Sequence, residues 1–210
     1  LDYLSVSVDG IKTYREIRGA SIEPVIEGIK AAQEVGHQVL MNCVVSRKNL
    51  SELEALVDLA EELGALISFE PLHETPGVEG GVWKDMGIGK ADLPAFRRSV
   101  DRLIEMKKEG RPIINSLTYL RMVRNQRPDF RCHAPQIVLS VASDGTIMSC
   151  RVHKEPLGHV SEGLARVWES SKKRREEIVR ECDGCLFFGY VENSLLYDFR
   201  PEVIAHYEWM

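Results

Sequence analysis

The chain has 210 residues, of which 44% are hydrophobic and 28% are charged, so it can build a sizeable core and is not a disordered polymer. Its formal net charge of -5 provides no basic surplus to neutralise phosphates, which argues against nucleic acid as a partner. No apolar stretch approaches the roughly 20 residues that a membrane-spanning helix requires, and no signal segment precedes a cleavage site. These features together predict a cytoplasmic protein.

The first seventy or so residues alternate between strand-like and helix-like periods. Residues 4–8, 37–45 and 65–70 are predicted strands, and helices are predicted between them, over 21–36 and 49–64. Short strands separated by such helices imply right-handed parallel crossovers, and hence an α/β sheet or part of a barrel. Three residues are expected to cap the two helices at their N-termini, namely Ser21 for the first, and the pair Asn49 and Glu52 for the second.

The middle of the chain begins with a long segment rich in glycine and proline. Residues 71–90 are predicted to form a loop at the end of the third strand, and loops of that length are usually functional or mobile. Two helices are expected to follow, over 92–109 and 116–126.

The pattern changes after Pro128. Strand-like stretches over 136–142 and 146–150 are joined through Ser143-Asp144-Gly145, which is a hairpin signal. A helix is expected near 162–180 and a shorter one around 201–207. The sequence therefore predicts two domains, residues 1–127 and residues 128–210.

The cysteines are concentrated in the second of these domains, which holds Cys132, Cys150, Cys182 and Cys185. The two-residue spacing of the last pair lets both sulfurs reach one metal centre. Folding the hairpin is expected to bring the first two together. Four thiolates suit a structural zinc ion or an iron-sulfur cluster equally, whereas disulfides are disfavoured in a reducing cytosol. Unpaired buried cysteines that bind no metal stay open as a further interpretation. Cys43 stands apart on a predicted strand and is expected to be a core residue.

A resemblance to a known family distinguishes between these metals. Cys132, Gly145, Cys150 and the Cys182-x-x-Cys185 pair resemble the SPASM or twitch domain of radical S-adenosylmethionine (radical SAM) enzymes. Further matches stand between them in the expected order: Ser143-Asp144-Gly145-Thr146-Ile147, Leu157-Gly158-His159-Val160 and Val167-Trp168-Glu169-Ser170. Upstream, two stretches are similar to the fourth and fifth strands of the radical SAM barrel: residues 5–10 with Arg18-Gly19, and residues 42–49 with Glu52-Leu53.

The resemblance implies an α/β fold made of the C-terminal half of a parallel partial (β/α)6 barrel, followed by a small α+β hairpin domain that binds a metal cluster. It implies one auxiliary 4Fe-4S cluster on Cys132, Cys150, Cys182 and Cys185. The CxxxCxxC loop that binds the SAM-cleaving cluster is absent from the sequence and belongs before the fourth strand. We therefore expect an upstream part with a second 4Fe-4S cluster, and no activity from this chain alone.

The implied activity is the use of a 5'-deoxyadenosyl radical from S-adenosylmethionine to modify a peptide, lipid or cofactor precursor, with a reductant such as ferredoxin or flavodoxin. In parallel barrels functional groups lie at the carboxyl ends of strands. That rule and the resemblance give the expected cofactor-binding residues: Ser7, Asp9, Arg18, Asn42 and Glu70.

Plainer roles stay open for some of them. Ser7 also fits the role of a small strand residue that is satisfied by neighbouring backbone groups. Asp9, which precedes Gly10, also fits the role of a turn former. For the whole chain, the alternative is a noncatalytic iron-sulfur or zinc-binding module used for protein interaction.

Overall fold

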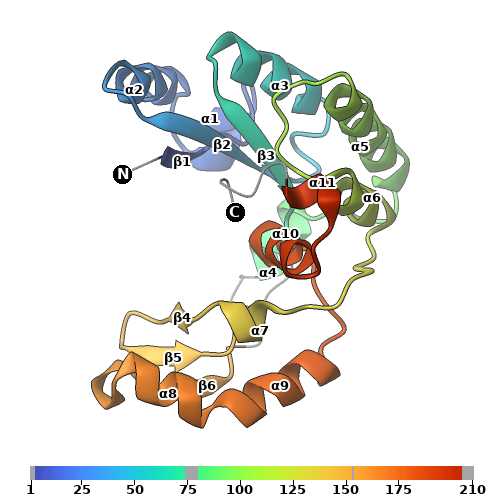
Figure 1. Ribbon diagram of the computed structural model, residues 1–210. Coiled ribbons are helices and arrows are strands. Elements are labelled where there is room, and N and C mark those ends of the chain that lie inside the picture. The colour runs from blue at the N-terminus through green and yellow to red at the C-terminus, as the bar shows by residue number, and fades with distance from the viewer. Residues whose placement is uncertain (1–2, 74–79, 153, 205–210) are drawn as a thin grey trace. The chain divides into compact units, whose positions relative to one another are not determined.

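The structure is a computed structural model that describes residues 3–73, 80–152 and 154–204. The chain divides into two compact units, which are shown in Figure 1 and are taken here one at a time. Among the described residues, the first unit comprises residues 3–73, 80–127 and 186–188. The second comprises residues 128–152, 154–185 and 189–204.

The first unit is built on a parallel sheet of three strands, β1 (Tyr3–Ser7), β2 (Gln38–Val45) and β3 (Leu66–Pro71), in the order β1-β2-β3. The prediction of an α/β fold with adjacent parallel strands is confirmed. One face of the sheet is apolar and fully buried, because every second residue of β2 and β3 points into the core: Met41, Cys43, Ile67 and Phe69. The residues on the other face of the sheet include polar side chains, so the two faces differ in polarity.

Six helices of this unit are described: α1 (Tyr14–Arg18), α2 (Glu23–Glu34), α3 (Leu53–Glu62), α4 (Gly80–Met86), α5 (Leu93–Lys108) and α6 (Leu117–Asn125). Figure 1 shows α2 beside β2 and α3 beside β3, and both pairs are in contact. The inner stripe of α3 is completely buried through Leu53, Leu56, Val57 and Ala60. Each large apolar side chain buried in this way contributes roughly 1.5–3 kcal/mol.

Several local predictions for this unit were wrong. Ser21 does not cap α2, because its hydroxyl bonds the Glu23 side chain, and neither Asn49 nor Glu52 caps α3. Residues 71–90 are not one long loop, since α4 lies within them and residues 74–79 lie outside the described range. The helix α4 is held by Arg47, whose Nε and Nη2 donate to the Asp85 and Lys84 carbonyls at 2.6 and 2.7 Å. The prediction of a helix over 116–126 is confirmed by α6, and the structure adds its N-terminal cap, Ser116, whose Oγ accepts from Tyr119 N at 3.0 Å.

The second unit contains short elements. These are α7 (Ala134–Ile137), β4 (Ser140–Val141), β5 (Thr146–Met148), β6 (Pro156–His159), a 3-10 turn (Val160–Glu162), α8 (Leu164–Ser170), α9 (Lys172–Glu181), α10 (Phe188–Tyr197), which belongs here from Gly189 on, and α11 (Pro201–Ile204). The strands form an antiparallel sheet in the order β4-β5-β6, with β4 and β5 linked through Asp144 and Gly145.

Here too the sequence misplaced some elements. The predicted strand over 136–142 is mostly absent, because α7, with Pro135 in its first turn, extends to Ile137 and leaves only β4 as a strand. The helix predicted near 162–180 is interrupted at Ser171, which separates α8 from α9. The strand β6 and the helix α10 were not predicted. Among the described residues, no helix has the length and apolar character that crossing a bilayer requires.

Candidate functional site

A row of polar side chains crosses the sheet of the first unit on the face opposite its core. Ser7, Asn42 and Ser68 are register partners on three adjacent strands, so they lie on the same face. The Asn42 amide is fixed at both ends, since its Nδ2 donates to Ser5 Oγ and its Oδ1 accepts from Ser68 Oγ. Ser5 and Ser7 are exposed and Asn42 is half-buried. The row therefore presents oriented hydroxyl and amide groups to whatever approaches this face.

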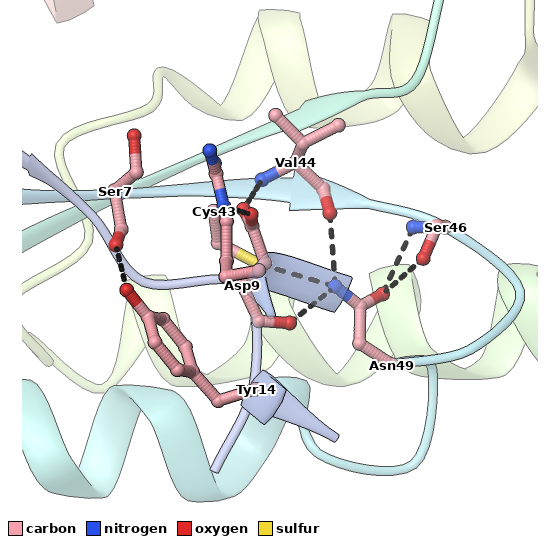
Figure 2. Close-up of polar contacts among 8 residues, drawn as sticks. Ser7, Asp9, Tyr14, Cys43, Val44, Ser46 and Asn49 are labelled. Atoms are coloured by element: carbon pink, nitrogen blue, oxygen red, sulfur yellow. Dashed lines mark hydrogen bonds and ion pairs between the residues drawn. The ribbon is translucent and has the colours of Figure 1, made fainter. Parts of the chain in front are cut away.

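A buried network at the carboxyl end of β1 and β2 surrounds Asp9 (Figure 2). The Asp9 carboxylate is almost fully buried and accepts from Val44 N at 2.7 Å and from Arg18 Nε. Asn49, also buried, donates through Nδ2 to the carbonyls of Asp9 at 2.6 Å and Val44 at 2.9 Å, and accepts from Ser46 N at 2.9 Å. These hydrogen bonds hold the segment that follows β1 against the end of β2 and the segment after it.

Glu52 holds the loop that leads from β1 to α1. Its carboxylate accepts three consecutive backbone N–H groups, from Ile11 at 2.5 Å, Lys12 at 3.0 Å and Thr13 at 3.1 Å. Together with the tertiary bonds of Asn49, this explains why the predicted capping pair is wrong. Both side chains satisfy backbone groups of another segment, a use that local spacing does not reveal.

Arg18 is placed by Asp9 at the rim of this unit. Its side chain is 37% exposed, and within the described residues it donates through Nε alone. A guanidinium carries five N–H donors, so the outer edge of Arg18 retains donors directed away from Asp9. Such an edge suits a carboxylate.

Glu70, at the end of β3, has a protein partner. Its Oε2 accepts from Phe188 N at 3.3 Å, while Tyr119 donates its hydroxyl to the Leu186 carbonyl at 2.8 Å. The Tyr119 and Phe188 rings meet edge to face, with centroids 5.5 Å apart. Glu70 thus helps to hold residues 186–188, which belong to the same unit.

In the second unit Cys132 lies near Cys182 and Cys185, while Cys150 shares the neighbour Tyr190 with Cys185. A hydrogen bond with Cys182 raises the pKa of the Cys132 thiol far above its usual range, burial raises it further, and the charge of Cys185 adds to the effect. Burial likewise raises the pKa of Tyr190, and charges at Cys150 and Cys185 contribute in the same direction. Each cysteine therefore lies close to another cysteine or to a neighbour that it shares with one.

The turn between Cys182 and Cys185 depends on Gly184. This glycine has a φ of +82°, a conformation that residues with a Cβ avoid, and its N–H donates to Cys182 Sγ at 3.3 Å. Cys43, in contrast, lies in the core of the first unit. Burial raises the pKa of its thiol, followed by the charge of Asp9.

The donor chemistry of the four thiols fits an iron-sulfur cluster. All are free, they come from three separate segments, and an N–H group already points at one sulfur, as is common around clusters. Within the described residues no three Cys, His, Asp or Glu side chains are close enough together to hold a single metal ion. In a four-iron cluster each thiolate binds a different iron, so its ligands stand farther apart than those of one ion.

Comparisons with known proteins support this interpretation. Residues 132–186 match the model of the SPASM family, an iron-sulfur cluster-binding domain. The AdoMet-dependent heme synthase of Methanosarcina barkeri is 25% identical over 211 residues, which cover 87% of this chain and 59% of that protein. A probable GTP 3',8-cyclase of Saccharolobus islandicus is 38% identical over 174 residues, covering 71% and 50%. The chain thus spans about half the length of the curated relatives it matches.

Two solved structures share the fold. Streptococcus suis SuiB has a TM-score of 0.56 at 19% identity, covering 78% of this chain and 42% of its own. Native anSMEcpe, solved with AdoMet and the Kp18Cys peptide, has a TM-score of 0.55 at 14% identity, covering 98% and 69%.

The family match concerns residues 132–186, and the relatives concern most of the chain. Residues 132–186 form a SPASM iron-sulfur domain. Over most of its length the chain is similar to radical SAM proteins, and the combination of such a relative with a SPASM domain supports this class.

Two features of these sites were missed in the sequence. Ser68 was not considered, although a serine between Ile67 and Phe69 on an apolar strand is the same signal that Asn42 gives on β2. The bonds of Asn49 left no signal, because they join segments that are distant in sequence.

Proposed function

We propose that this chain is the C-terminal part of a radical SAM enzyme. In this proposal residues 1–127 supply the second half of a partial (β/α)6 barrel, and residues 128–210 supply an auxiliary domain with one 4Fe-4S cluster. The observation that carries the proposal is the SPASM match over residues 132–186, within which all four of these cysteines lie. The ligands are then Cys132, Cys150, Cys182 and Cys185.

The polar row and Arg18 are the proposed contacts to S-adenosylmethionine. When bound and reduced, this cofactor supplies a 5'-deoxyadenosyl radical that abstracts hydrogen from a substrate. The oriented Asn42 amide and the exposed Ser7 hydroxyl suit the ribose hydroxyls, and the outer edge of Arg18 suits the carboxylate. Asp9 is proposed to act through Arg18, which it orients by the ion pair, and Glu70 to shape the same end of the sheet.

Protonation of the cysteines couples to cluster assembly. In the structure the Cys132 thiol is hydrogen-bonded to Cys182, and this bond raises the pKa of Cys132. Thiolates, not thiols, are the ligands, so assembly releases protons and is favoured as the pH rises.

Two substrate classes have support. A peptide is proposed first, because the structural neighbours include SuiB bound to its precursor peptide SuiA and anSMEcpe with a peptide. A cofactor precursor is the second candidate, because the sequence relatives are a heme synthase and a probable GTP cyclase. Both require a reductant, proposed to be of the ferredoxin or flavodoxin type.

The deciding experiment begins with the chain purified without oxygen. We expect a brown protein with iron and sulfide each near about four per chain. The chain alone should form no 5'-deoxyadenosine above background, whereas the full-length protein with dithionite should form it. Stoichiometric zinc without sulfide would instead establish the alternative, a zinc-binding module for protein interaction.

A further inference from the structure

The helix α10 lies outside the matched SPASM residues, yet it carries polar groups that contact two of the cysteine segments. Tyr190, Ser194 and Asp198 follow one another at intervals of four residues, which places them on one face of the helix and its extension. The Asp198 N–H still donates to the Ser194 carbonyl at 3.0 Å, so the helical geometry persists to this residue. Tyr190 and Ser194 are buried.

Each of these side chains bonds the residue that directly follows a clustered cysteine. The Tyr190 hydroxyl accepts from Arg151 N at 2.9 Å, next to Cys150. Ser194 Oγ accepts from His133 N at 2.9 Å, next to Cys132. One helix face thus holds two segments that are distant in sequence, at the same position relative to each cysteine.

The His133 side chain is fixed as well. Its Nε2 lies 3.1 Å from Asp198 Oδ1 and its Nδ1 lies 3.2 Å from Gln136 Oε1, while its ring stacks near Tyr197 with centroids 4.4 Å apart. The residue after Cys132 is therefore held through both its backbone and its ring.

This placement affects the cysteines through the planar peptide bond. The N–H of Arg151 lies in the same rigid plane as the Cys150 carbonyl, so anchoring that N–H fixes ψ of Cys150. The same holds for His133 and Cys132. A fixed backbone fixes where each Sγ points, and groups that orient metal ligands commonly change metal affinity by about 10–100-fold.

We propose that Tyr190, Ser194 and Asp198 are positioning residues for the auxiliary cluster, and that α10 thereby belongs to the cluster-binding site. The inference rests on the proposed function, because it requires Cys132 and Cys150 to be ligands. A helix that only packed against the domain would hold the fold without affecting the cluster.

The test compares Tyr190→Phe and Ser194→Ala with Asn193→Ala in the 210-residue chain. Asn193 is the matched control, because its Nδ2 donates to Gly189 O at 2.7 Å within the same helix. After anaerobic reconstitution to equal iron content, the reduced cluster is examined by electron paramagnetic resonance, its midpoint potential is measured, and iron release to a chelator is timed. We expect both variants to show altered g values, a shifted potential and roughly tenfold faster iron release. Asn193→Ala should match the unsubstituted chain.

Wild-type spectra, potential and release in both variants would overturn the inference. If circular dichroism shows that neither variant folds, Asp198→Ala decides, since the Asp198 side chain is 38% exposed and its loss spares the core. An altered cluster in that variant supports positioning, and an unaltered one rejects it. An unsubstituted chain that binds no iron and sulfide rejects the proposed function itself, which is a distinct outcome.

Discussion

The two units differ in how they remain folded. Most of the large side chains with complete burial belong to the first unit, among them Tyr119, Phe69, Phe96, Ile29, Met41, Leu53, Leu56, Ile67, Leu103, Met106, Ile113 and Leu120. In the described part of the second unit the completely buried apolar side chains include Ile147 and the smaller Val167 and Val191, and the longest strand has four residues. Small domains with limited cores commonly depend on a metal or another crosslink.

The side-chain hydrogen bonds also serve different purposes in the two units. In the first unit Asn49 and Glu52 tie loops to a sheet that already has a core. In the second unit the buried polar side chains Tyr190 and Ser194 hold the segments that carry cysteines. The first unit should therefore fold independently of metal, and the second should not.

Removing one proposed cluster ligand should have the largest effect. Cys182→Ala is expected to abolish the brown colour and to make the second unit sensitive to protease, because metal binding supplies folding free energy where separate segments are crosslinked. Iron and sulfide analysis and limited proteolysis measure this. The first unit should remain resistant.

Cys43→Ala is the control for that experiment. It removes a buried thiol from the core of the first unit, which costs about 1 kcal/mol, and should leave the iron content unchanged. Equal iron loss from both variants would contradict the separation of the units.

Asn49→Ala should have the opposite effect, because it should destabilise the first unit and leave the second unit and its iron unchanged. It leaves the Asp9 and Val44 carbonyls and Ser46 N without this partner in a buried site, so we expect the free energy of unfolding of the first unit to fall by about 3–5 kcal/mol. Urea denaturation followed in the first unit measures it, while iron content per chain should stay unchanged.

The matched control is Asn125→Ala, at an exposed position near the end of α6. Its cost should be within about 0.5 kcal/mol. A loss of iron on Asn49→Ala would show that the first unit supports the cluster and would break the comparison.

The difference between the two units also explains which helices and strands could be predicted from the sequence. The period-two alternation of β2 and β3 and the helical stripe of α3 are local signals of burial, so the parallel sheet was predicted with boundaries that shifted by about a residue. In the second unit the short helix α7 extends into the segment that was expected to be a strand, and β6 and α10 were missed. Short elements with little core leave a weak periodic pattern.

The candidate sites divide in the same way. Cysteine spacing and Asn42 on an apolar strand are visible in sequence, because a thiol or amide is conspicuous where it stands. The bonds of Asp9 to Val44 and of Ser194 to His133 join residues 35 and 61 positions apart. No local pattern specifies such partners.

A smaller effect on stability, but a clear one on function, is expected from Asn42→Ala. The half-buried amide bonds two serine hydroxyls, so the fold should lose only about 1–2 kcal/mol. In the full-length protein, formation of 5'-deoxyadenosine should fall on the order of tenfold, because the proposed contact of Asn42 with S-adenosylmethionine is removed. Ser21→Ala, at the start of the loop into α2, is the control and should keep full activity. Unchanged activity in Asn42→Ala would remove this residue from the proposed cofactor site.

The smallest expected effect concerns the ion pair between the partly buried Lys48 and the exposed Asp85, which joins α4 to the segment after β2 in the first unit. The hydrogen bond from Lys48 lowers the pKa of Asp85 below its usual value. A carboxyl group whose pKa is lowered on folding contributes stability above its unfolded pKa, near about 3.9, and loses that contribution as the pH falls through the folded value. The stability difference between the unsubstituted chain and Asp85→Asn should therefore be small at pH 6, should vanish in acid, and should shrink in concentrated salt, which screens exposed charges. Urea titrations at pH 6 and pH 3 measure it, with Glu62→Gln, an exposed position on α3, as the control. A difference that grew in acid would mean that Asp85 stabilises the first unit in its protonated form, whereas a change in iron content would mean that even this surface contact reaches the second unit.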